Sequence, residues 1–140
     1  MIDIVNETDL DIPQDFLQEI LEFLGGGDVE LLFVSDSKMR QLNLEYRNMD
    51  SSTDVLSFPL ENCGIQNMPL GAIVIAENFV QKAAQHFNHS LDDEIALLFI
   101  HGLLHLKGYD HEVDSGEQRQ KEQEIITYFH LPESLIVRAC

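Results

Sequence analysis

Hydrophobic residues recur along the chain with two spacings, one typical of strands and one typical of helices. Near the N-terminus, Ile2 and Ile4 alternate with polar residues, which predicts a short strand with one buried face. Over residues 13–24 the hydrophobic side chains recur at helical spacing, and Gly25 then begins a run of three glycines. We therefore expect a strand followed by an amphipathic helix.

The middle of the chain predicts a second strand, a second helix and two further strands. Residues 30–34 (ELLFV) predict a strand, after which Ser35 or Asp36 can cap a helix. The apolar face of that helix is expected to carry Met39, Leu42, Leu44 and Tyr46. Strands are expected at 54–59 and 71–76, and the second of these has the nearly continuous apolarity of a central strand.

Three helices are predicted in the second half of the chain. The first covers residues 78–88, and the next is opened by Ser90 and ended by Gly108. This second helix is hydrophobic nearly all round, so it should pass through the middle of the molecule. Asp114 or Glu117 can cap a last helix that reaches about residue 129, and a short docked tail should follow it.

The order of these elements predicts the fold class. We expect an α+β or mixed α/β domain, in which about four strands pack with about five helices. The 140 residues contain no repeat or linker and match one ordinary domain, so residues 1–140 are taken as one unit. The hydrophobic pattern does not determine the order of the strands.

The charge balance restricts the partners. Eight Lys and Arg against 25 Asp and Glu give a net charge of −17, which repels nucleic acid and anionic membranes at long range. A polyanionic substrate therefore needs local positive charge. Lys38, Arg40 and Arg47 provide such a cluster, although a cluster of this kind is also typical of a solvated helix face.

The cysteines and the hydrophobic runs indicate a cytoplasmic protein. Cys63 and Cys140 are the only cysteines and lie far apart, which argues against a disulfide framework. The first ten residues contain no Lys or Arg, unlike a secretory or transit peptide. No apolar run approaches the roughly 20 residues of a membrane span.

The segment HGLLHLKGYDH places three histidines where they can share one metal ion. His101 and His105 stand four residues apart and so face the same side of a helix. Gly108 can adopt a positive φ and turn the chain, which lets His111 return toward the other two. Geometry therefore favours three converging imidazoles.

Three imidazoles with one open position are typical of catalytic zinc, which lowers the pKa of a bound water toward about 7. We expect one Zn²⁺ per chain, and another divalent transition metal fits the same ligands. A single histidine on an apolar helix is more often structural, but three at these offsets favour a metal site. The remaining histidines have no partner at ligand spacing and receive no role: His86, His89 and His130.

One absence argues against proteolysis. The spacing of the three histidines is also that of the metzincin proteases, which carry a Glu general base directly after the first histidine. Gly102 occupies that position here. The helix therefore lacks the carboxylate that would activate water for peptide cleavage.

Two motifs resemble the YbeY-type endoribonucleases of bacterial ribosomal RNA maturation. One is HGLLHLKGYDH, and the other is NLEYRNMDSSTDVLSFP over residues 43–59. The strand LGAIVIA lies between them, as in the family, so the resemblance covers most of residues 43–112. It implies a mixed domain with a metal in a cleft, the three histidines as ligands and a functional arginine at Arg47.

The chemistry of arginine supports a role for Arg47, because a guanidinium can bind two phosphate oxygens at once. Arg47 could equally be a surface residue or an ion-pair partner of Asp50 or Asp54. Thr53 and Asp54 are expected to brace the loop and Ser57 to face the cleft, unless the segment is only a core strand with a turn. Ala72 departs from the family, which usually has an acid there.

The first hypothesis is a metal-dependent, single-strand-specific endoribonuclease that acts in small-subunit ribosomal RNA maturation and ribosome quality control. Its partners would be ribosomal RNA and a ribosomal subunit or ribosomal proteins, with no membrane and no DNA. A second hypothesis is a non-catalytic ribosome-assembly factor with a structural metal, because strong RNA binders are usually basic. A zinc hydrolase of another substrate is the third.

Overall fold

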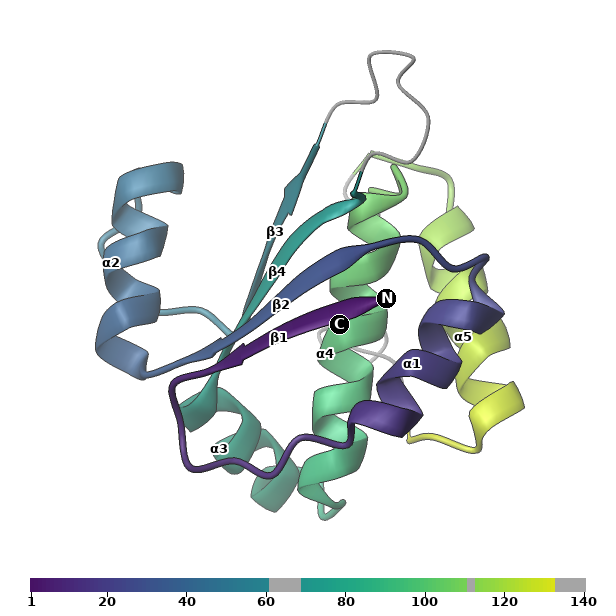
Figure 1. Cartoon of the computed structure of the whole chain (residues 1–140), viewed down its shortest axis with the longest axis horizontal. Coiled ribbons are helices and arrows are strands. Elements are labelled where there is room, and N and C mark those ends of the chain that lie inside the picture. The colour runs from purple at the N-terminus through teal and green to yellow at the C-terminus, as the bar shows by residue number, and fades with distance from the viewer. Residues whose placement is uncertain (61–68, 111–112, 133–140) are drawn as a thin grey trace.

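A four-stranded mixed sheet forms the framework of the part of the chain that the structure describes. The structure is a computed structural model, and it describes residues 1–60, 69–110 and 113–132. The strands run in the order β1-β2-β4-β3 across the sheet (Figure 1). β1 is parallel to β2 and β2 is parallel to β4, whereas β3 is antiparallel to β4. The strands are β1 (Ile2–Asn6), β2 (Val29–Val34), β3 (Val55–Pro59) and β4 (Gly71–Ala76).

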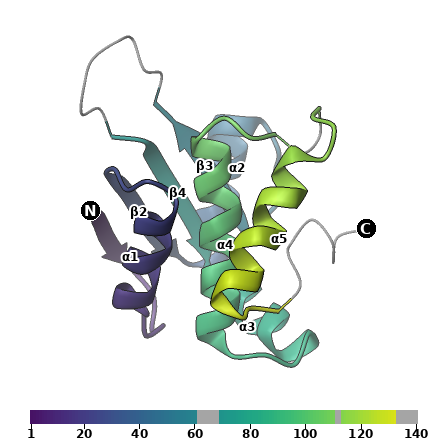
Figure 2. The ribbon, with the colours of Figure 1, turned by 90° about the vertical axis from the view of Figure 1, so that its right-hand side faces the viewer.

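Within the described ranges, five helices pack around the sheet. They are α1 (Gln14–Phe23), α2 (Asp36–Arg47), α3 (Glu77–His86), α4 (Leu91–Leu106) and α5 (Glu117–Phe129). Helices α1, α4 and α5 lie on one side of the sheet and α2 lies on the other (Figure 1, Figure 2). The predicted α+β domain of about four strands and five helices is confirmed, and the strand order is now known.

β4 is buried on both of its faces, as its apolarity predicted. Ile73 and Ile75 belong to the larger core, between the sheet and helices α1, α4 and α5. Val74 and Ala76 belong to a smaller core with Met39 of α2. Alternating residues of one strand therefore fill two separate cores.

α4 passes through the middle of the molecule and packs against β3, β4, α1, α3 and α5. It begins where predicted, since the Ser90 Oγ accepts a hydrogen bond of 3.0 Å from the Asp93 N–H. It ends at a turn in which Gly108 has a φ of 97° and the Tyr109 N–H donates to the Leu104 carbonyl. Among the described helices, none combines the length and the hydrophobicity that a membrane span requires.

The predicted apolar face of α2 is partly wrong. Leu44 and Tyr46 are 46% and 61% exposed, whereas Met39 and Asn43 are the buried residues of this helix. Asn43 can be buried because its side-chain amide donates a hydrogen bond of 2.8 Å to the Ser51 carbonyl. The buried stripe therefore includes a polar residue that hydrophobicity alone does not select.

The start of α5 differs from its prediction. Gly116 is the N-cap residue, so the predicted cap by Asp114 or Glu117 is wrong. Asp114 still stabilises the start of the helix, because its carboxylate accepts hydrogen bonds from the Gly116 and Gln118 N–H groups.

Most of the docked tail that was expected after residue 129 and most of the expected loop at 61–69 lie outside the described residues.

Candidate metal and substrate site

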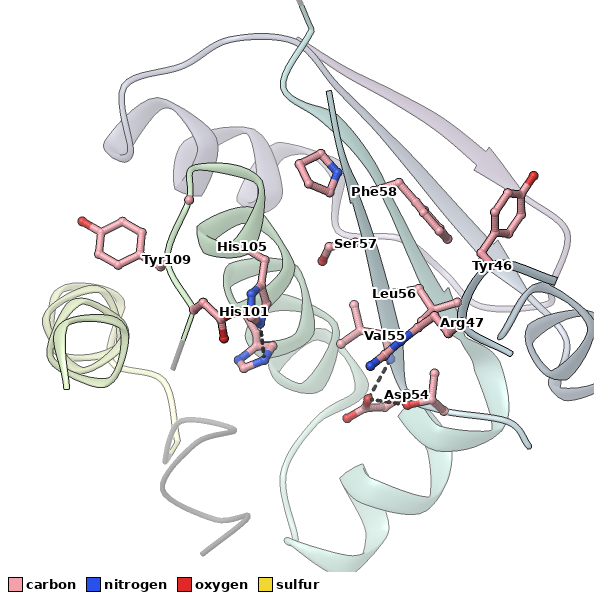
Figure 3. Close-up of a pocket in the computed structure, with 14 residues that line it drawn as sticks. Tyr46, Arg47, Asp54, Val55, Leu56, Ser57, Phe58, His101, His105 and Tyr109 are labelled. Atoms are coloured by element: carbon pink, nitrogen blue, oxygen red, sulfur yellow. Dashed lines mark hydrogen bonds between the residues drawn. The ribbon is translucent and has the colours of Figure 1, made fainter. Parts of the chain in front are cut away.

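Helix α4 brings two of the predicted metal ligands together at its C-terminal end. The Nε2 atoms of His101 and His105 lie 3.2 Å apart, and their ring centroids are 4.7 Å apart (Figure 3). Both side chains are half-buried, because the helix faces the sheet on one side and α5 on the other. The i, i+4 spacing thus produces the convergence that the sequence predicted.

The separation of these two nitrogens fits a shared metal ion. Two imidazole nitrogens that bind one tetrahedral zinc at about 2.0–2.1 Å lie about 3.3 Å from each other. His111, the third predicted ligand, lies outside the described residues. Within the described ranges, no group of three His, Cys, Asp or Glu side chains is placed to bind a metal. The pair fits a metal, and the complete ligand set stays a prediction.

A buried carboxylate that was not predicted from the sequence lies behind His101. The Oε2 of Glu122, on α5, is 2.9 Å from the His101 Nδ1 and also accepts a hydrogen bond of 3.2 Å from Gln118. Their positions in the sequence could have indicated this contact, since Gln118 and Glu122 share the buried helical stripe of Ile125 and Ile126. Polar residues on a buried stripe indicate a specific polar contact.

The histidine pair opens into a cavity of about 670 Å³. β3 forms one wall, and the ends of α2 and α4 complete it. Figure 3 shows the two histidines on the α4 side and Tyr46 and Arg47 on the α2 side, with residues of β3 between them. The two family-like motifs therefore meet at one cavity.

The two arginines of α2 have different surroundings. Arg40 binds Asp50 through two hydrogen bonds, Nε to Oδ1 at 2.7 Å and Nη2 to Oδ2 at 3.1 Å. These bonds and the opposite charges lower the pKa of Asp50 and raise the pKa of Arg40. Arg47 lines the cavity, and its guanidinium makes no hydrogen bond or ion pair with any described residue. Arg47 therefore does not form an ion pair with Asp50 or Asp54, which was one alternative to a functional role.

Residues at the start of β3 hold the cavity wall in place. The Asp54 carboxylate accepts hydrogen bonds from the Val55 N–H at 2.7 Å and from the Thr53 hydroxyl at 3.4 Å. The Ser57 hydroxyl donates to the Gly102 carbonyl at 3.3 Å, which links β3 to α4. Thr53 and Asp54 thus brace the strand, and Ser57 both lines the cavity and fixes its wall.

Close packing explains why Gly102 stands where the metzincins have a glutamate. A Cβ at this position would lie 3.0 Å from the Ile73 Cγ2 and 3.1 Å from the Ser57 Oγ. Ala72, which stands where the YbeY-type family usually has an acid, shares the α2 face of β4 with Val74 and Ala76, so it points away from α4. An acid at this position would therefore point away from the two histidines of α4.

Several further side chains line the cavity without having been predicted to do so, among them Tyr46, Phe58, Tyr109 and Asp110. Tyr46 and Phe58 contact each other edge to face, with ring centroids 5.2 Å apart. His89, to which no role was given, forms a buried pair with Glu94 near the start of α4, where Nε2 and Oε1 are 2.7 Å apart. This pair lies at the opposite end of α4 from the cavity.

The sequence closely matches proteins of one family. Residues 4–130 match the family described as endoribonuclease YbeY. A protein of that name from Nautilia profundicola is 53% identical, over 99% of this chain and 98% of its own length. Another from Aliarcobacter butzleri is 52% identical, over 99% of each chain.

A solved structure has a similar fold. The solution structure of a Thermotoga maritima protein superposes with a TM-score of 0.57 and 29% sequence identity, covering 93% of this chain and 92% of that one. The chain belongs to the endoribonuclease YbeY family.

Proposed function

We propose that this endoribonuclease uses one zinc ion, bound by His101, His105 and His111, to cut single-stranded segments of ribosomal RNA. Its task would be the maturation of small-subunit ribosomal RNA and ribosome quality control in the cytoplasm, beside a ribosomal subunit or its proteins. Family membership supports hydrolysis of RNA. The observation that carries the metal assignment is the convergence of two Nε2 atoms, 3.2 Å apart, at a cavity.

The donor set favours zinc over the harder divalent cations. Imidazole nitrogens suit zinc and similar transition metals, whereas magnesium and calcium prefer oxygen ligands. When bound, such a metal supplies a Lewis acid and lowers the pKa of water toward neutrality. The histidine side chains hold it at the wall of the cavity, where RNA can reach it.

Arg47 is positioned to hold the phosphate during cleavage. It is the only Lys or Arg among the described residues that line the cavity, and its guanidinium is not engaged by a carboxylate there. A guanidinium can bind two oxygens of one phosphate group and stabilise the charge that develops on them. In this acidic protein, Arg47 supplies the local positive charge that a polyanionic substrate needs.

Tyr46 supports a preference for unpaired RNA. Its ring is 61% exposed, lines the cavity beside Arg47 and is supported from the side by Phe58. Unpaired bases can leave their stack and bind to aromatic rings, whereas bases within a duplex cannot. A nucleotide whose base stacks on Tyr46 would place its phosphate near Arg47.

The packing of α5 argues against a purely structural metal. Ile125 and Ile126 of α5 are 0% and 4% exposed and belong to the larger core. Apolar burial on this scale docks a helix without a metal ligand. Removal of the metal should therefore leave α5 in place. If the metal instead served only to hold the last helix, its removal would release α5.

The proposal is tested with one RNA sequence in two forms, single-stranded and annealed to its complement, and with DNA of the same sequence. We expect the wild-type protein to cut the single-stranded RNA and to leave the duplex and the DNA largely intact. His105→Ala should abolish cleavage while the circular dichroism spectrum stays unchanged. Equal cleavage by wild type and His105→Ala would contradict the proposal.

A further inference from the structure

We infer that Glu122 is a positioning residue for the metal site, which fixes the ring of His101 so that its Nε2 faces the metal. This inference rests on the proposed function, because it takes His101 to be a metal ligand. Glu122 lies on α5, outside both family-like motifs and outside the residues that line the cavity. Its effect would therefore be transmitted through His101.

The contact between Glu122 and His101 is short and shielded from water. The Glu122 Oε2 is 2.9 Å from the His101 Nδ1, and the two side chains are 1% and 11% exposed. This geometry suits a hydrogen bond from the His101 Nδ1–H to the Glu122 carboxylate. In the tautomer that carries its proton on Nδ1, the lone pair lies on Nε2, the atom that is 3.2 Å from the His105 Nε2.

The burial of Glu122 calls for a specific reason. Taking a carboxylate out of water is costly unless hydrogen bonds compensate, and hydrophobic residues of similar size often replace buried charges without loss of stability. Gln118, which is fully buried, donates a second hydrogen bond of 3.2 Å to the same Glu122 oxygen. Gln118 thus supports Glu122, and Glu122 in turn contacts one ring nitrogen of His101.

Metal chemistry supplies this reason. Histidine ligands of metals commonly donate their second ring N–H to a carboxylate, which fixes the tautomer and the ring orientation and makes the ligating nitrogen more basic. Without the carboxylate, the His101 ring could rotate or present Nε2 in its protonated form. Glu122 would hold the ring in the competent state before the metal arrives, which lowers the cost of binding.

The chain contains a matched control for this contact. His89 and Glu94 form a second buried pair, with 2.7 Å between Nε2 and Oε1 and side chains 8% and 1% exposed. Glu94 and Glu122 are therefore equally buried and each binds one histidine. Only Glu122 binds a histidine of the cavity.

The test compares zinc binding by wild type, Glu122→Gln and Glu94→Gln, measured by competition with a chromophoric chelator. Loss of a carboxylate behind a ligating histidine should weaken zinc binding by about 10- to 100-fold. We expect that change in Glu122→Gln, and a change below about threefold in Glu94→Gln. Substituted cobalt gives a second readout, because its visible spectrum should shift in Glu122→Gln and stay constant in Glu94→Gln.

The outcomes separate this inference from the proposed function. Absence of zinc binding by the wild type would overturn the proposed metal site itself. Equally tight binding by the wild type and by Glu122→Gln would overturn the role of Glu122 and leave the proposed metal site standing. Equal weakening in Glu122→Gln and Glu94→Gln would have the same meaning. Should Glu122→Gln not fold, Gln118→Met removes the second donor to the same oxygen. It should weaken zinc binding about threefold or more, and an unchanged affinity would contradict the inference.

Discussion

Two arginines of α2, Arg40 and Arg47, stand two helical turns apart and differ in what they contact. Arg40 is engaged by Asp50, and Arg47 ends the helix at the cavity. Asn48 adopts a left-handed conformation with a φ of 58° directly after Arg47, and the chain then returns past Arg40. The turn after the helix therefore decides which arginine is available to a substrate.

Replacement of Arg47 should affect catalysis and leave stability nearly unchanged. We expect Arg47→Ala to lower kcat/KM for single-stranded RNA by about 10²- to 10³-fold, the usual cost of losing one stabilising donor. The free energy of unfolding should change by less than about 0.5 kcal/mol, since the side chain is exposed. Arg40→Ala is the control and should keep near wild-type kcat/KM. An equal loss in both variants would show that α2 has merely shifted.

Replacement of Tyr46 should weaken binding of RNA rather than the chemical step. Stacking of one base is worth about 1–3 kcal/mol, so Tyr46→Ala should raise the Kd for a single-stranded oligonucleotide about 5- to 150-fold. Tyr46→Phe should bind almost as well as wild type. Tyr128→Ala is the matched control, because Tyr128 is 62% exposed and lies on α5, outside the residues of the cavity. Equal binding by Tyr46→Ala and wild type would exclude stacking at this position.

At the scale of elements, local patterns predicted most of the fold. The apolar run at β4, the cap at Ser90 and the turn at Gly108 depend on neighbouring residues, and each is confirmed. Strand order could not be predicted, because it depends on pairings between distant segments. The same limit applies to Glu122, whose partner His101 is 21 residues away and on another helix.

The glycine that begins β4 should be essential to the cavity wall. Gly71 has a φ of 142°, and a Cβ there would lie only 2.3 Å from the Phe58 carbonyl oxygen of β3. Gly71→Ala should lower the free energy of unfolding by about 3 kcal/mol through strain and steric conflict, measured by urea denaturation. Gly26→Ala, with positive φ and open space around it, should cost only about 1 kcal/mol. Equal losses in the two variants would contradict this account of the β3–β4 contact.

The whole molecule combines a strongly acidic composition with a polyanionic substrate. Its net charge of −17 disfavours the broad phosphate contacts that most nucleic-acid-binding proteins use. Under the proposed function, recognition then depends on a few contacts inside the cavity, namely the metal, Arg47 and an aromatic ring. The charge composition alone could not predict this arrangement, because it does not show where one cation is placed.

The salt dependence of RNA binding should therefore be shallow. Each phosphate contact contributes about −0.7 to the slope of log K against log salt for a single strand. With one or two such contacts, the slope should lie between about −0.7 and −1.4, measured by fluorescence anisotropy with a short labelled RNA. A slope near −5 would indicate an extended basic surface, contrary to this account.

The zinc requirement is tested most directly by a zinc titration of metal-stripped protein in which RNA cleavage is followed at each addition. We expect that stripping abolishes cleavage and that cleavage returns in proportion to added zinc, reaching its maximum at about one equivalent per chain. Full cleavage of single-stranded RNA by the stripped protein, before any zinc is added, would contradict it.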